Sequence, residues 1–143
     1  MRKVILLGFI VFCGVCFGQD SKFYYLGKSV NKSKFYLSIH DNDTTNNTYD
    51  IWAKRIDPVI ETKNKKGKVF KKKGNHSMSL HRIFCREEKI ATLYVIEYDG
   101  KGNVINKIDY DGFIDKTYII PESLSETFFN FVCRGIFEDL ADD

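Results

Sequence analysis

Cys85 and Cys133 follow an N-terminal segment with the pattern of a secretion signal, and this combination constrains the fold more than any other feature. Exported proteins mature in oxidising compartments, where paired cysteines form stable disulfides. Cys13 and Cys16 lie within the signal and would be removed with it. The mature chain would keep an even number of cysteines, so we expect one bond between Cys85 and Cys133.

The predicted signal peptide covers residues 1–18. Arg2 and Lys3 form a positive start, Val4 to Phe12 is almost entirely apolar, and a small residue precedes Gln19. A membrane-spanning helix needs about 20 apolar residues, and this run is shorter. We therefore expect cleavage before Gln19 and a secreted, periplasmic or cell-surface protein.

A lipid anchor is the alternative for this segment. Cys13 and Cys16 lie where a lipoprotein cysteine would lie, but Phe12 and Val15 precede them where a small residue is preferred. Contact with a membrane would therefore come only through an uncleaved signal or through such an anchor.

Composition predicts one domain over residues 19–143, since the mature chain is long enough for a core of its own. Aromatic residues make up 15% of the chain, which favours a sheet-rich fold. The formal charge is +3 and falls near neutral once Arg2 and Lys3 leave. The overall charge therefore does not favour nucleic acid, which an exported protein is also not expected to meet.

Apolar alternation predicts an antiparallel, curved sheet of about six strands. The segments are 23–26, 35–40, 49–56, 78–85, 90–98 and 104–110. Segment 90–98 is apolar on both faces, which indicates a central strand. From the two-residue period of a strand we expect one face to carry Leu93 and Val95 and the other to carry Ile90, Tyr94, Ile96 and Tyr98.

The spacing becomes helical after Pro121. Ser123 and Glu126 form a capping-box pattern, and Gly135 follows the last apolar residue. The apolar positions at helical spacing are Leu124, Phe128, Phe131 and Val132. We expect a helix over residues 123–134 that packs Leu124, Phe128 and Val132 on the sheet.

These elements predict an α+β fold in which a disulfide pins the C-terminal helix to the sheet. Cys133 lies in the last helical turn, and Cys85 ends a strand. In the chain-entropy model, closing so long a loop contributes roughly 4 kcal/mol.

Short motifs along the chain resemble one bacterial family. They are Ile51-Trp52-Ala53-Lys54, Cys85-Arg86, Tyr98-Asp99 with Gly102, Ile120-Pro121 with Ser123 and Glu126, and Val132-Cys133. Together they resemble the surface-adhesin protein E-like family over residues 23–134. Tyr118 stands where members of that family often have tryptophan.

The resemblance implies a small secreted domain with an antiparallel sheet and a C-terminal helix. It also implies a non-catalytic interaction module, adhesin-like, that binds a host or envelope protein. A homodimer is compatible with it. Many relatives need not be adhesive, so the family name carries function less well than fold.

The cysteines and histidines are the candidates for a catalytic or metal-binding site. Cys85 with His81 or His40 as base would suit a nucleophilic mechanism, but a disulfide-bonded cysteine cannot attack. His40, His76 and His81 lack the paired spacing of zinc ligands. We therefore expect no catalytic residue, no cofactor and no metal.

Three aspartate-rich segments, 41–43, 99–103 and 109–112, faintly resemble calcium loops. They lack the spaced acidic ligands and terminal glutamate of an EF-hand. Aspartate and glycine also favour turns, and we interpret all three segments as turns.

The chain concentrates positive charge at one place, between residues 63 and 73. Its lysines are Lys63, Lys65, Lys66, Lys68, Lys71, Lys72 and Lys73. This stretch could bind a polyanion such as a sulfated glycan, an acidic protein surface or a phospholipid head group. The alternative, which the sequence favours, is a solvated hairpin arm kept soluble by its lysines.

Two function classes remain. The first is a secreted or cell-envelope interaction module that binds a protein or polyanion partner. The second is a periplasmic small-ligand-binding protein or hydrolase with its site on the concave face of the sheet. An enzyme needs a buried polar constellation, and no such set is visible on one element, so we favour the first class.

Overall fold

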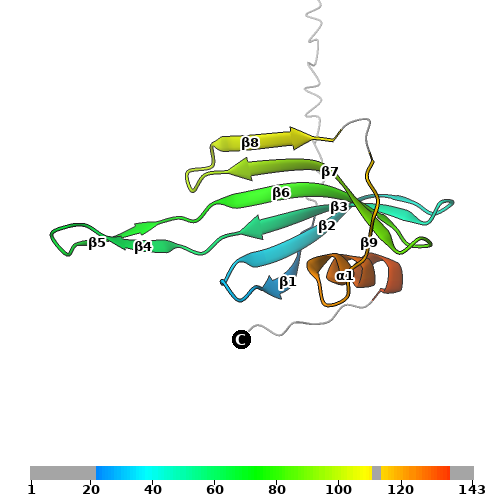
Figure 1. The fold of residues 1–143 in the computed structure, drawn as a ribbon, viewed down its shortest axis with the longest axis horizontal. Coiled ribbons are helices and arrows are strands. Elements are labelled where there is room, and N and C mark those ends of the chain that lie inside the picture. The colour runs from blue at the N-terminus through cyan, green and yellow to red at the C-terminus, as the bar shows by residue number, and fades with distance from the viewer. Residues whose placement is uncertain (1–21, 111–113, 136–143) are drawn as a thin grey trace, which may run out of the picture.

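A curved antiparallel sheet forms the body of the protein (Figure 1). The computed structural model describes residues 22–110 and 114–135; the predicted signal peptide with Cys13 and Cys16 lies outside them. The main strands are β1 (Tyr24–Lys28), β2 (Lys34–Asp43), β3 (Thr48–Ile56), β6 (His76–Phe84), β7 (Lys89–Tyr98) and β8 (Val104–Asp109). They pair in the order β1-β2-β3-β6-β7-β8, and the short β9 (Thr117–Tyr118) pairs with β7. The predicted antiparallel sheet is confirmed.

One helix packs on this sheet. Helix α1 (Leu124–Phe129) continues into a π-helical segment, Asn130–Arg134. The core that joins helix and sheet contains Leu26, Leu37, Ile51, Ala53, Ile83, Ile90, Phe128, Phe129 and Phe131. We call the side of the sheet that carries this core the helix face and the opposite side the outer face. None of the described helices is long and apolar enough to cross a membrane.

The buried side of the helix differs from the expected one. Phe128 is 3% exposed as predicted, but Leu124 is 39% exposed. Phe129 and Phe131 are buried as well, and Val132 packs beside the core. The chain widens into a π-helix from Asn130 onward, so a regular α-helical spacing no longer describes which residues face the sheet.

Both ends of the helix follow from local chemistry. The Ser123 hydroxyl accepts a hydrogen bond from the Glu126 N–H at 3.4 Å, as the capping pattern predicts. The Glu126 carboxylate accepts from the Glu122 N–H at 2.7 Å, one residue before the expected partner. Gly135 ends the helix with φ 63°, a conformation that glycine adopts without a side-chain clash.

A disulfide joins Cys85 to Cys133. Their Cα atoms are 5.6 Å apart, and 48 positions separate them in the chain. The bond links the end of β6 to the last helical turn, so it closes the unit formed by sheet and helix. The predicted pairing is confirmed.

Strand β7 contains a bulge that changes which side chains share a face. Leu80 pairs with Tyr94 and His81 pairs with Thr92, so Leu93 is an extra residue. Ile90 therefore lies on the helix face, whereas Tyr94 lies on the outer face. The expectation that Ile90 and Tyr94 share a face was wrong, because a uniform two-residue period cannot anticipate an inserted residue.

The lysine-rich stretch forms two further strands. β4 (Ile60–Lys63) pairs with β5 (Val69–Lys72) in a separate two-stranded sheet. We call residues 59–73 the arm. Figure 1 shows β4 and β5 projecting beyond the main sheet, with the helix toward the other end.

Candidate functional site

The tip of the arm is an ordered turn closed by Asn64. Its side-chain oxygen accepts hydrogen bonds from the backbone N–H of Lys66 (3.0 Å) and of Lys68 (2.9 Å). Its backbone N–H donates to the Lys68 carbonyl at 3.0 Å. Gly67 takes φ 75° within this turn, where glycine avoids steric cost.

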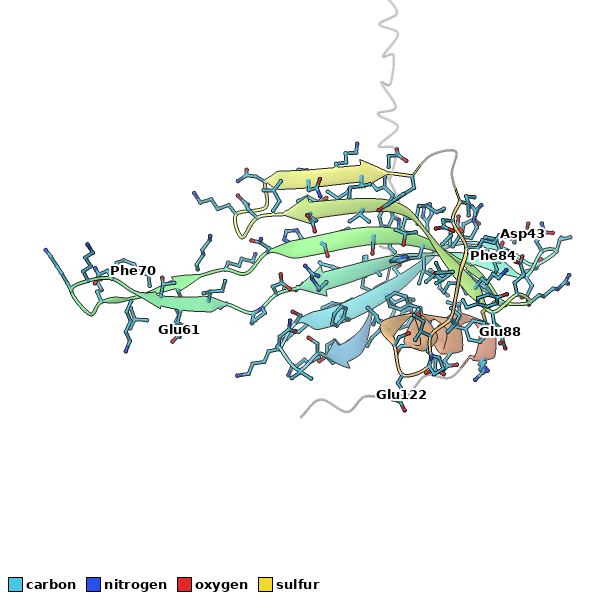
Figure 2. All side chains as sticks on the ribbon, viewed as in Figure 1. Asp43, Glu61, Phe70, Phe84, Glu88 and Glu122 are labelled. Carbon is cyan, nitrogen blue, oxygen red and sulfur yellow. A yellow bond between two sulfur atoms is a disulfide. The ribbon has the colours of Figure 1, made fainter. Side chains whose placement is uncertain are left out.

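The arm presents lysines on both of its sides. Lys63 pairs with Val69 and Lys71 with Glu61, while Lys72 pairs with Ile60 on the other side. Paired residues of antiparallel strands share a side, so alternation divides the lysines. Figure 2 shows Glu61 and Phe70 on the arm, away from the helix. The positive charge therefore surrounds a narrow hairpin.

Apolar side chains are mixed with these lysines. Val69 is 46% exposed and Phe70 is 47% exposed. The ammonium of Lys68 lies 5.6 Å from the centre of the Phe70 ring. The arm thus combines cations with accessible apolar surface, which suits a ligand that carries both acidic and apolar groups.

The base of the arm is tightly packed. A Cβ atom on Gly74 would lie 2.4 Å from the carbonyl oxygens of Asp57 and Pro58. A Cβ atom on Gly100, in the β7–β8 turn, would lie 2.1 Å from the Lys73 carbonyl oxygen. Buried Ser33 donates its hydroxyl hydrogen to the Asp57 carboxylate at 2.9 Å. Contacts from both neighbouring turns therefore hold the base in place.

The cysteines and His81 do not form a catalytic pair. Cys85 is bonded to Cys133. Nε2 of His81 lies 2.8 Å from the Ser79 hydroxyl, and its Nδ1 lies 3.1 Å from the Thr92 hydroxyl. Burial lowers the pKa of His81 to about 4, so its ring is neutral at pH 7.

The other two histidines lie beside aromatic rings. The His40 ring centre is 6.2 Å from Trp52, and His76 stacks on Tyr98 at 4.4 Å. Within residues 22–110 and 114–135, no three His, Cys, Asp or Glu side chains are placed to hold a metal ion.

Residues 99–103 form a turn as predicted, but residues 41–43 end strand β2, and the turn begins after them. An aspartate carboxylate holds each of these two turns. Asp43 accepts hydrogen bonds from Asn46, and Asp99 accepts them from Asn103. These side-chain hydrogen bonds lower the pKa of both aspartates. The third segment lies partly outside the described residues.

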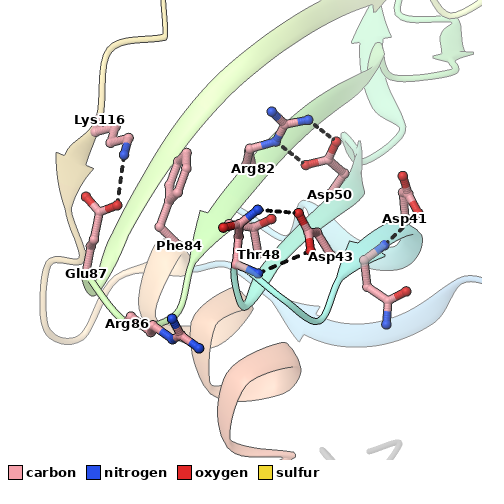
Figure 3. A pocket seen from close by; sticks show the side chains of 11 residues that line it. Asp41, Asp43, Thr48, Asp50, Arg82, Phe84, Arg86, Glu87 and Lys116 are labelled. Atoms are coloured by element: carbon pink, nitrogen blue, oxygen red, sulfur yellow. Dashed lines mark hydrogen bonds and ion pairs between the residues drawn. The ribbon is translucent and has the colours of Figure 1, made fainter.

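A polar cleft of about 630 Å³ lies at the end of the sheet away from the arm (Figure 3). At its centre the Arg82 guanidinium donates two hydrogen bonds to the Asp50 carboxylate, both of 2.7 Å. The hydrogen bond to Asp50 raises the pKa of Arg82. Such a two-point pair fixes both side chains.

A second ion pair lines the same cleft. Lys116 donates to Glu87 at 2.8 Å, and its ammonium lies 4.1 Å from the Phe84 ring centre. The hydrogen bond from Lys116 lowers the pKa of Glu87. Glu87 is therefore ionised at neutral pH and acts as an acceptor, so it does not supply a general acid for hydrolysis.

A more apolar cleft of about 460 Å³ adjoins the polar one on the outer face and shares Arg82 with it. Trp52, Leu80, Leu93 and Tyr94 form its apolar wall. The rings of Trp52 and Tyr94 meet nearly at right angles, with centres 6.4 Å apart. This corner offers an aromatic surface beside an arginine.

Sequence reasoning identified the arm but missed both clefts. The signal that could have located the clefts is alternation, which places Asp50 and Trp52 on one side of their strand. It also places Leu80 and Arg82 on one side of another strand. The sequence does not show that these two strands are paired, with Asp50 opposite Arg82 and Trp52 opposite Leu80.

Comparison with known proteins identifies the family. The family model described as surface-adhesin protein E matches residues 23–134. No curated protein and no solved structure matches the chain. The match covers nearly the whole described region, including both disulfide cysteines and the arm. The chain therefore belongs to the surface-adhesin protein E family.

Proposed function

We propose that this protein is a non-catalytic interaction module of the cell envelope or surface, and that its arm binds a polyanionic partner. Membership of a surface-adhesin family supports a surface location and an adhesin-like role. The arm supplies the binding charge through Lys63, Lys65, Lys66, Lys68, Lys71, Lys72 and Lys73.

The packed base of the arm carries this proposal. A solvated loop needs lysines only for solubility, and its attachment can be loose. Here Gly74 and Gly100 permit contacts that a Cβ atom would block, and buried Ser33 is bonded to Asp57. The packed base holds the arm and its lysines in a fixed direction, which lowers the entropic cost of binding an extended ligand.

A comparison of ion pairing in the polar cleft and on the arm also supports the arm as the binding element. In the polar cleft, Arg82 is paired with Asp50 and Lys116 with Glu87. On the arm, the one ion pair among the described residues is Lys71 with Glu61 at 3.2 Å, and both side chains are exposed. Most arm lysines are therefore available to an external anion.

Heparin-affinity chromatography tests the proposal, with heparin as a sulfated glycan. The mature protein should bind at about 50 mM salt and elute as salt rises, because screening weakens exposed charge pairs. Replacing Lys71, Lys72 and Lys73 by glutamine should shift elution to lower salt.

The matched control is the triple glutamine variant of Lys22, Lys89 and Lys116, which removes the same charge outside the arm. It should elute close to the unmodified protein. Circular dichroism checks that each variant is folded. If the unmodified protein flows through the column, or if both triple variants shift equally, the arm is not the binding element.

A further inference from the structure

The arm extends β3 and β6 of the main sheet in the same register. Ile56 pairs with His76, and beyond them the Asp57 N–H donates to the Asn75 carbonyl at 2.9 Å. Ile60 then pairs with Lys72 in the same register. No residue is gained or lost between the two pairings, although residues 57–59 and 73–75 between them lie outside the strands. β4 and β5 therefore keep the register of β3 and β6.

By this register, the side of the arm that corresponds to the outer face carries Ile60, Thr62, Phe70 and Lys72. Thr62 pairs with Phe70, and Ile60 pairs with Lys72. The exposed Phe70 ring and the Lys72 cation therefore extend the surface that begins on the main sheet with Ile56 and His76.

Aromatic rings lie at intervals along the outer face. Next to the arm, His76 stacks on Tyr98 with their rings 4.4 Å apart. Farther along the same face, Trp52 meets Tyr94 edge to face at 6.4 Å. Two aromatic platforms thus follow the arm in succession.

Cations lie between these platforms. Lys54 pairs with Met78 on the outer face, and Lys107 pairs with Ile96 there. The Lys107 ammonium lies 5.3 Å from the Tyr94 ring centre. The acidic Asp109 pairs with Tyr94 beyond them. The surface that leads from the arm to the Trp52–Tyr94 corner is therefore cationic and aromatic.

We propose that the ligand of this surface is an acidic glycan that lies along the arm and continues onto the outer face. This inference rests on the proposed function of the arm. Sulfate or carboxylate groups pair with the lysines, and sugar rings place their apolar faces against the outward sides of the His76–Tyr98 stack and of the Trp52–Tyr94 pair. A ligand that alternates anionic groups with flat apolar faces matches a surface that alternates lysines with rings.

The length of the surface sets the length of the ligand. Ten residues separate Thr62 from Trp52 along the chain, and at about 3.3 Å per residue the two lie roughly 33 Å apart. A short oligosaccharide would fit on the arm alone. A longer one would reach the Trp52–Tyr94 corner.

The single tryptophan of the chain makes this testable. Emission from Trp52 reports the outer face without background from other tryptophans. Heparin-derived oligosaccharides long enough to span the surface should bind and change Trp52 emission. Short ones should bind more weakly and leave the emission unchanged. Anisotropy of labelled oligosaccharides measures binding independently of Trp52.

Two controls separate sugar stacking from charge. Polyglutamate carries anionic charge without sugar rings, so it should bind the arm without changing Trp52 emission. Tyr94→Leu should weaken binding of the long oligosaccharide by roughly tenfold. Tyr118→Leu, at a ring 71% exposed on β9, should not weaken it.

The possible outcomes test separate parts of the proposal: the path of the glycan, the class of the ligand and the binding role of the arm. If long oligosaccharides bind by anisotropy and Trp52 emission is unchanged, the glycan path over the outer face is wrong and the binding role of the arm stands. If polyglutamate changes the emission as the glycan does, the ligand class is wrong. Binding to phosphatidylserine vesicles without binding to any oligosaccharide also overturns the glycan assignment. If no polyanion binds at low salt, the proposed function itself fails.

Discussion

At the scale of single residues, His81 is a buried polar group whose chemistry is coupled to folding. Its two ring nitrogens lie within hydrogen-bonding distance of Ser79 and Thr92, and its ring centre is 5.7 Å from that of Phe128 on the helix. Hydroxyls satisfy the neutral ring, but no carboxylate is among these partners. Protonating the ring in place would therefore add an uncompensated charge beneath the helix.

This arrangement predicts a loss of stability in mild acid. The ordinary pKa of His81 is 6.5, and burial lowers it to about 4 in the folded protein. Between these values the unfolded chain binds a proton that the folded protein does not, so the free energy of unfolding falls as pH falls. From pH 7.5 to pH 5 the expected loss is roughly 2 kcal/mol, measured by urea denaturation.

Two variants isolate the contribution of His81. In His81→Gln the difference between pH 7.5 and pH 5 should largely disappear. His40→Gln replaces an exposed histidine, and this variant should keep the full difference in stability between the two pH values. An equal pH dependence in His81→Gln and in the unmodified protein would assign the effect to other groups.

At the scale of elements, helix α1 and its π-helical continuation hold the core together. Asn130 marks the change of spacing, and its side-chain oxygen is buried with no hydrogen-bond partner among the described residues. The wider turn places both Phe129 and Phe131 in the core. Leu124, at the helix start, remains at the rim.

Two alanine variants on the helix should therefore differ strongly. Phe128→Ala removes a ring that is 3% exposed, and it should lower the free energy of unfolding by about 3–5 kcal/mol through the cavity that it leaves. Leu124→Ala should cost less than about 1 kcal/mol, because that side chain keeps much of its contact with water. Urea titrations measure both, and comparable losses would contradict the burial described for this helix.

The arm predicts a local effect of one glycine. In Gly74→Ala the new Cβ would lie 2.4 Å from the carbonyl oxygens of Asp57 and Pro58, so the base must open. We expect faster hydrogen exchange at the arm amides and weaker heparin binding. Thr45→Ala, in the exposed turn between β2 and β3 and away from the arm, serves as the control. Unchanged exchange at the arm amides in Gly74→Ala would mean that the base does not hold the arm.

The elements differ in how far the sequence reveals them. The helix was predictable because Ser123 and Gly135 mark its ends through local chemistry. The face of Tyr94 was not, because the extra residue at Leu93 is defined by pairing with another strand. The arm was predicted as a hairpin without strand bounds, because its side chains are all exposed and no apolar alternation marks its strands. The two clefts were also not predictable, because they form where side chains of paired strands meet, as Asp50 meets Arg82.

At the scale of the whole molecule, the proposed binding surface lies outside the core. The core lies on the helix face, whereas the aromatic platforms lie on the outer face. The arm projects beyond the main sheet (Figure 1). Stability and recognition therefore depend on different residues. Substitutions of the arm lysines should change binding without changing the free energy of unfolding.

The disulfide is the bond that ties this small molecule together, and its removal should be costly. Cys85 directly follows β6 and Cys133 lies in the last helical turn, so the bond closes a loop whose ends are 48 positions apart in the unfolded chain. In the chain-entropy model this contributes about 4 kcal/mol, and removing native disulfides from small secreted domains typically costs 2–5 kcal/mol. That is a large part of the stability expected for one such domain.

The paired variant Cys85→Ala with Cys133→Ala should therefore unfold at a much lower urea concentration than the oxidised protein. Reductant should lower the midpoint of the unmodified protein toward that of the variant, and it should leave the variant unchanged. Both cysteines pack against the core, so some of the loss reflects packing. The measurement with reductant isolates the effect of the bond itself, because reduction keeps both sulfur atoms in place. A midpoint that does not respond to reductant, although thiol titration shows full reduction, would mean that packing alone holds the helix on the sheet.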